Sequence, residues 1–230
     1  MRLSFMPIVA LGLAILGGCA STPPQQPMTM QATALKAEAG RVGVAMSNVP
    51  KVDTQFPGAG CLLCMAAASA MNSSLTDHVR TLPPEDVPAL KDRAASLIGA
   101  KGAKPVTIDA ALDVSALPDF KSEVPNFARK DFRGLKDKHQ IDKLLMIQIN
   151  TIGMVRTYSA YIPTAEPKAV FNGTAYLVDL KTNALEWYHP FSVTKAADGA
   201  WDESPKFPRL TNAYFQALEM GKDEILRPLQ

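Results

Sequence analysis

Two cysteines, Cys61 and Cys64, are the side chains of this sequence best suited to covalent chemistry. They open the apolar run CLLCMAAASAM, and their spacing predicts that both lie on one turn of a helix. Such a pair can form a local disulfide, take part in thiol–disulfide exchange, or offer soft ligands to a metal. The surrounding residues decide among these three roles.

A metal site or a haem at this pair lacks the other residues that it needs. Structural zinc normally takes four ligands, and no second CxxC or HxxxH is present. Met65 stands where the haem attachment motif CxxCH requires histidine. We therefore expect no metal and no cofactor.

Thiol–disulfide exchange is the stronger alternative, because the first turn of a helix stabilises a thiolate. However, the central residues Leu62 and Leu63 offer no polar group for proton transfer. Thioredoxin-like enzymes also place a cis-proline just before their final hairpin; Pro105 lies at a suitable sequence distance from the cysteines, but the last expected hairpin begins only near residue 168, so the order of elements does not fit. We predict that Cys61 and Cys64 are small core residues joined by a disulfide. A periplasmic thiol–disulfide oxidoreductase is the alternative function.

No other catalytic motif is found in the sequence. GxSxG, a Walker loop and HExxH are absent, and His78, His139 and His189 fall in separate expected elements. We therefore expect no catalytic residue and a protein that is not an enzyme. The near balance of 24 basic and 22 acidic side chains gives no electrostatic case for binding nucleic acid.

The amino-terminal residues predict secretion. Arg2 precedes an apolar run over residues 5–16, which is too short for a permanent membrane anchor. The following LGGC, residues 16–19, resembles the bacterial lipobox. That resemblance implies that Cys19 carries covalent lipid, palmitate included, and becomes the first residue of the mature protein. Because Ala20 rather than Asp follows, it further implies the outer membrane, with the domain facing the periplasm.

These features divide the chain into three parts. Residues 1–18 form the lipoprotein signal peptide, and residues 19–40, rich in Pro and Gln, form the lipidated end and a flexible tether. Residues 41–230 form one periplasmic domain, since the hydrophobic content of 47% suffices for a sizeable core.

The domain is expected to be α+β. Apolar residues at helical spacing predict a helix whose buried face holds Cys61, Cys64, Ala68, Met71, Leu75, His78 and Leu82. We read the CLLCMAAASAM part as a core helix, in preference to a membrane-inserting or subunit-contact surface. Further helices are predicted over 85–100, around 132–139 and from Thr211 or Asn212 to the end; strands are predicted over 41–47, 104–108 and 144–155, with a hairpin over 168–193 turning at Asn183. A mixed, mostly antiparallel sheet packed against helices, with a C-terminal helix, buries all these faces in a single domain.

The segments IDKLLMIQI and AYLVDLKTNALEW, at 141–149 and 175–187, resemble segments of a known group of proteins. Together with the order of elements, they look like a group of bacterial outer-membrane lipoproteins that share the domain of the curli secretion lipoprotein and the TolB amino-terminal domain. The resemblance implies a module that binds other envelope proteins or assembles with them, possible homo-oligomers included, while attached to the membrane through its lipid.

Two aromatic residues are the candidate partner-binding site. Trp201 and Phe207 stand among prolines and charges in GAWDESPKF. Exposed aromatic anchors with a polar rim suit a protein interface. The alternative is that both rings fold back over the edge of the sheet.

Overall fold

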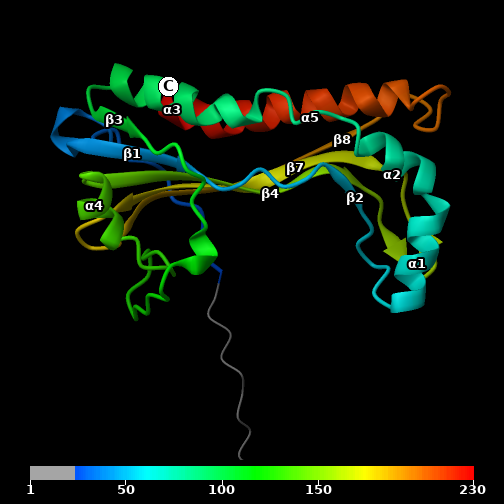
Figure 1. Cartoon of the computed structure of the whole chain (residues 1–230), viewed down its shortest axis with the longest axis horizontal. Helices are drawn as coiled ribbons and strands as arrows, with labels where there is room; N and C mark the ends of the chain where they lie inside the picture. The colour runs from blue at the N-terminus through cyan, green and yellow to red at the C-terminus, as the bar shows by residue number, and fades with distance from the viewer. Residues whose placement is uncertain (1–23) are drawn as a thin grey trace, which may run out of the picture.

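The computed structural model describes residues 24–230. Its centre is a six-stranded mixed sheet in the order β3-β1-β4-β7-β8, with β2 pairing beside β4 (Figure 1). The strands are β1 (Arg41–Met46), β2 (Asp53–Gln55), β3 (Lys104–Thr107), β4 (Lys143–Val155), β7 (Lys168–Asp179) and β8 (Leu185–Ala196), and a separate hairpin joins β5 (Tyr158–Ser159) to β6 (Ile162–Pro163).

The helices are spread along the chain between and after the strands. They are α1 (Leu62–Met71), α2 (Ser73–Val79), α3 (Leu90–Ala100), α4 (Gly134–His139) and α5 (Pro208–Leu226), with 3-10 turns at Ala37–Ala39, Val87–Ala89, Val114–Ala116 and Arg227–Leu229. The fold class is therefore confirmed as a single-domain α+β fold with a C-terminal helix. The long antiparallel ladders β4–β7 and β7–β8 dominate the sheet, whereas β1 pairs in parallel with β3 and β4.

One face of the sheet is covered by α3 and α5 (Figure 1). The alternate residues of β7 that were predicted to share a face, such as Phe171 and Leu177, lie in this core with Tyr214 of α5. Helix α5 approaches β7 closely, because a Cβ at Gly221 would lie 2.3 Å from the Phe171 ring. The predicted start of this helix was wrong: it begins at Pro208, whose fixed φ suits a first helical position.

The opposite face of the sheet is covered over only part of its area. Segment 108–142, including α4, places Phe132 and Ile141 on β4 and β7, where they form a second core with Tyr176. Asn183 closes the β7–β8 turn with a positive φ of 68°, the left-handed conformation predicted for it.

The described part of the expected tether lies against the domain. Met28 forms an isolated bridge with Tyr188 of β8, and Leu35 is 1% exposed in the main core. Lys143 also donates to the Ala34 carbonyl at 3.1 Å. Residues 24–40 are thus fixed to the domain by pairing and burial.

Candidate functional site

The helix that carries the CxxC is not a core helix, which corrects the sequence-based prediction. Only Cys64 and Ala68 of α1 are buried, whereas Leu62 is 88%, Leu63 69% and Met71 57% exposed. The predicted helical face is interrupted because α1 ends at Met71 and α2 begins only after Asn72. Met71 is therefore exposed, whereas Leu75, Val79 and Leu82 are buried. Helix α1 projects from the body of the domain, on the side of the sheet opposite α3 and α5 (Figure 1).

A small separate core holds α1 against the β5–β6 hairpin. Phe56 and Tyr158 meet edge to face at 5.8 Å, and Cys64 and Ala68 pack with them. Gly58 allows the close approach: its φ is +89°, and a Cβ there would lie 1.8 Å from the Tyr158 carbonyl oxygen. We call this unit, residues 56–71 with 157–165, the lobe.

The free end of the lobe is apolar. Five large side chains from α1 and the hairpin remain exposed there and constitute what we call the apolar tip: Leu62, Leu63, Met65, Tyr161 and Ile162. Neither strand of the hairpin was predicted, because two-residue strands carry no periodicity that a sequence can show.

The two cysteines lie within the lobe and are bonded to each other, with their Cα atoms 4.9 Å apart. Cys61 is not on the helix face, because it is the extended N-cap residue of α1 and its sulfur accepts the Cys64 backbone N–H at 2.9 Å. Consequently Cys61 is exposed while Cys64 is 3% exposed, which corrects the expectation that both are buried. The Tyr161 hydroxyl, 3.7 Å from the Cys61 sulfur, joins the cysteine pair to the hairpin.

A polar bridge connects the lobe to the sheet. Arg156, just after β4, donates to the Asn72 side-chain oxygen at 2.7 Å. The Asn72 amide in turn donates to the Ala68 carbonyl at 2.7 Å and to the Tyr158 hydroxyl at 2.6 Å. Asn72 is 3% exposed, so this bridge fixes the base of the lobe in a site largely closed to water.

Trp201 and Phe207 stack on each other with parallel rings whose centroids are 6.2 Å apart. The Arg156 guanidinium lies 4.9 Å from the centre of the Trp201 ring, and Phe207 lies 5.6 Å from the His78 ring. Both rings are half-buried and pack against the main core. Their role in binding a partner stays a prediction.

Part of the second sheet face carries uncharged polar side chains that no described segment buries. Strand alternation puts Gln148, Asn172, Thr174, Ser192 and Thr194 on the same side as Tyr176 and Tyr188, and all five are half-buried or exposed. We call these five residues the open face. At the border with segment 108–142 the surface forms a pocket of about 270 Å³ lined by Phe127, Gln148, Thr174 and Tyr188, among others.

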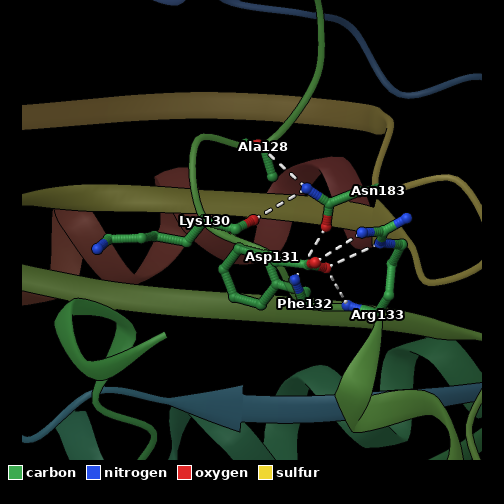
Figure 2. A network of polar contacts seen from close by, with 6 residues as sticks. All are labelled: Ala128, Lys130, Asp131, Phe132, Arg133 and Asn183. Atoms are coloured by element: carbon green, nitrogen blue, oxygen red, sulfur yellow. Dashed lines mark hydrogen bonds and ion pairs between the residues drawn. The ribbon is translucent and has the colours of Figure 1, made fainter. Parts of the chain in front are cut away.

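Asn183 fixes the loop that borders this pocket (Figure 2). Its side chain accepts from the Phe132 backbone N–H at 3.0 Å and donates to the carbonyls of Ala128 and Lys130 at 3.1 and 2.9 Å. Asn183 is fully buried. The turn between β7 and β8 therefore determines the position of a loop about 50 residues earlier in the chain.

The described residues show no metal centre. Within 24–230, no group of three or more His, Cys, Asp or Glu side chains is arranged to hold a metal ion. The three histidines belong to α2, α4 and β8: His78 contacts Thr211, and His189 stacks on Trp187. In that same part of the chain, no helix is long and apolar enough to cross a membrane. Cys19 lies outside the described residues.

No protein-family model matches the chain, and no curated protein matches it. Solved structures do resemble it. A PelC dodecamer from Paraburkholderia phytofirmans is 12% identical over 89% of this chain and 97% of its own, with a TM-score of 0.34. A protein from Xanthomonas campestris is 11% identical over 88% and 90%, with a TM-score of 0.38. A lipoprotein from Neisseria meningitidis is 14% identical over 79% and 98%, with a TM-score of 0.29. Similarities of this size do not assign the chain to a family.

Proposed function

We propose that this protein is an outer-membrane lipoprotein, anchored through Cys19, whose periplasmic domain binds another envelope protein and so serves as an assembly module. The observation that carries the binding role is the open face. The other face of the same sheet is covered by α3 and α5, and segment 108–142 covers the neighbouring part of this one.

The chemistry of the open face fits a protein partner. Its amide and hydroxyl groups can donate and accept hydrogen bonds, and none of the five residues is charged, so these five side chains can be covered without desolvating an ion. The adjoining pocket, with Phe127 and Tyr188 in its wall, offers an apolar seat for one side chain of the partner. Aromatic residues of this kind often anchor interfaces.

The anchor is tested by replacing Cys19. The Cys19→Ala variant should lose palmitate labelling and leave the membrane fraction, because a covalent lipid on that sulfur is the proposed attachment. Continued labelling of the variant would refute the lipid assignment.

The binding surface is tested by photo-crosslinking in intact cells. A photoreactive residue at Ser192, on the open face, should form a discrete adduct with an envelope protein. The matched control places the same residue at Ser96, an exposed serine of α3 on the other side of the sheet. Equal adducts from both positions, or none from Ser192, would contradict the proposal.

A further inference from the structure

The apolar tip has no counterpart elsewhere on the described surface. Its five members are 41% to 88% exposed, and they come from two segments about 100 residues apart that the lobe brings together. The other exposed large apolar residues, Met71, Val124 and Met220, belong to the far end of α1, a loop and α5. Large apolar side chains gathered on one projection indicate a contact surface.

The lack of charged residues in the lobe indicates which kind of partner the tip contacts. The sequence has no Asp, Glu, Lys or Arg from residue 56 to residue 76, nor from residue 157 to residue 165. A protein interface usually surrounds its apolar centre with a polar and charged rim, and a standard one uses about 20–30 residues on each side. Met65 shares a pocket with Asp53, Asp77 and Arg80 at one edge of the tip. The other four side chains of the tip stand on segments without charge, so an apolar solvent fits them better than a second protein surface.

The position of the tip relative to the first described residues also favours contact with the membrane. The described chain begins on the side of the sheet to which α1 projects, opposite α3 and α5 (Figure 1). Pro24 lines the pocket beside Thr174 and Tyr188, which agrees with this placement. Pro24 is only five positions after Cys19. At a span of at most about 3.5 Å per residue, Cys19 and its lipid attachment lie within roughly 18 Å of Pro24.

We infer that the apolar tip inserts into the acyl-chain boundary of the membrane that carries the lipid anchor. Leu62, Leu63 and Ile162 enter the apolar layer, and Tyr161, with its hydroxyl beside the Cys61 sulfur, lies at the interface where amphipathic rings are favoured. The disulfide and the small core of the lobe hold these side chains outward. Two attachment points, lipid and tip, then fix the orientation of the domain relative to the bilayer. The distance limit between the lipid and Pro24 depends on the Cys19 anchor proposed above.

Because the lobe carries no charge, its contact with a membrane should not depend on anionic lipid or on salt. A polybasic surface binds only anionic lipid and dissociates at high salt, whereas insertion of uncharged side chains depends on neither. The tip should therefore contact pure phosphatidylcholine as well as mixtures with anionic lipid, at 0.05 M and at 1 M salt alike.

The test uses the full chain, processed by the cell, with a photoreactive residue at Ile162, and scores adducts with lipid, with other proteins and with a second copy. Lipid adducts are expected in cells and in phosphatidylcholine vesicles carrying the purified protein. The Leu62→Ser, Leu63→Ser variant should reduce them at least tenfold, because each buried leucine contributes more than a factor of ten to transfer out of water. The control Met220→Ser removes a similarly exposed apolar side chain from α5 and should leave them unchanged.

Palmitate labelling of the same samples separates the two proposals. Lipid adducts from a chain without palmitate would support the tip and refute the anchor. A labelled chain that yields no lipid adduct, or whose Ile162 adducts are with a protein or a second copy, would overturn the insertion of the tip.

Discussion

Arg156 donates a 2.7 Å hydrogen bond to the side-chain oxygen of Asn72 while its guanidinium lies 4.9 Å from the centre of the Trp201 ring. This one side chain, at the end of the central strand β4, therefore contacts both the base of the lobe and the loop before α5. The two regions were separate candidates in the sequence, and the structure joins them through a cation that no sequence pattern marked.

The first prediction concerns this bridge. Arg156→Met should cost about 1 to 3 kcal/mol, because it leaves the buried Asn72 oxygen without its donor. Amide hydrogen exchange should rise in α1 and in the β5–β6 hairpin more than in the β4–β7 ladder. Arg93→Met, which removes an exposed arginine 3.6 Å from Asp86, is the control. Uniform loss of protection over the whole domain would contradict a local role.

The second prediction concerns Asn183. Asn183→Gly keeps a residue that tolerates the positive φ, but it removes three hydrogen bonds to the loop 128–132. We expect a loss of about 2 to 4 kcal/mol in unfolding free energy, since buried backbone groups lose their partners. Asn183→Ala should lose more, because alanine adds backbone strain. Urea unfolding measures both, and equal stability of Asn183→Gly and the wild type would refute the role of the side chain.

Trp201 and Phe207 are the subject of the third prediction. If they bind a partner, Trp201→Ala with Phe207→Ala should weaken partner recovery from cells while the melting temperature stays nearly unchanged. Because both rings are half-buried and pack against the main core, the alternative outcome is a fall of several degrees. That fall, with recovery intact at low temperature, would assign the pair to the core.

A fourth prediction follows from His78. Burial, with a smaller effect from the positive charge of Lys206, lowers the pKa of this imidazole below its ordinary value. Its Nε2 lies 2.8 Å from the Thr211 hydroxyl, which itself donates to the Lys206 carbonyl. The ring nitrogen is therefore the donor, in the neutral form as in the charged one.

A lowered histidine pKa means that the unfolded chain takes up the proton first. The contribution of His78 to stability is thus complete above the ordinary pKa of histidine and is lost as pH falls through the folded pKa. Unfolding free energies measured from pH 7.5 to 5 should fall less steeply for His78→Asn than for the wild type. The control is His139→Asn on α4, and an unchanged slope in His78→Asn would contradict the assignment.

The sequence predicted most of the sheet because its strands are strongly apolar runs: Leu144 to Ile147 and the alternating residues of β7 read as buried and are buried. It failed at α1 because this helix is apolar on all sides, a pattern that usually means burial. Spacing shows which residues share a helix face but not whether another element covers that face. The side-chain bonds by which Asn72 and Asn183 contact distant segments could not be predicted either, since they join residues 51 to 86 positions apart.

The last prediction returns to Cys61 and Cys64. If the pair is structural, the two sulfurs should be bonded to each other in protein taken from cells. After mild reduction of the folded chain, iodoacetamide should modify Cys61, which is exposed, and reach Cys64 only after unfolding. Because the disulfide closes so short a loop, Cys61→Ala with Cys64→Ala should cost only about 1 to 3 kcal/mol, and function should survive at low temperature.

The thiol–disulfide oxidoreductase alternative predicts a different set of results. Cys61, the accessible sulfur, would attack a substrate disulfide, and Cys64 beneath it would resolve the mixed disulfide. Cys64→Ala alone should then trap that intermediate, detectable as a reducible adduct on a non-reducing gel, and function should be lost from a variant that is still stable. The lobe offers only the Tyr161 hydroxyl near the Cys61 sulfur and no charged side chain to assist the proton transfer. We therefore expect no trapped adduct with Cys64→Ala, and its appearance would refute the structural assignment.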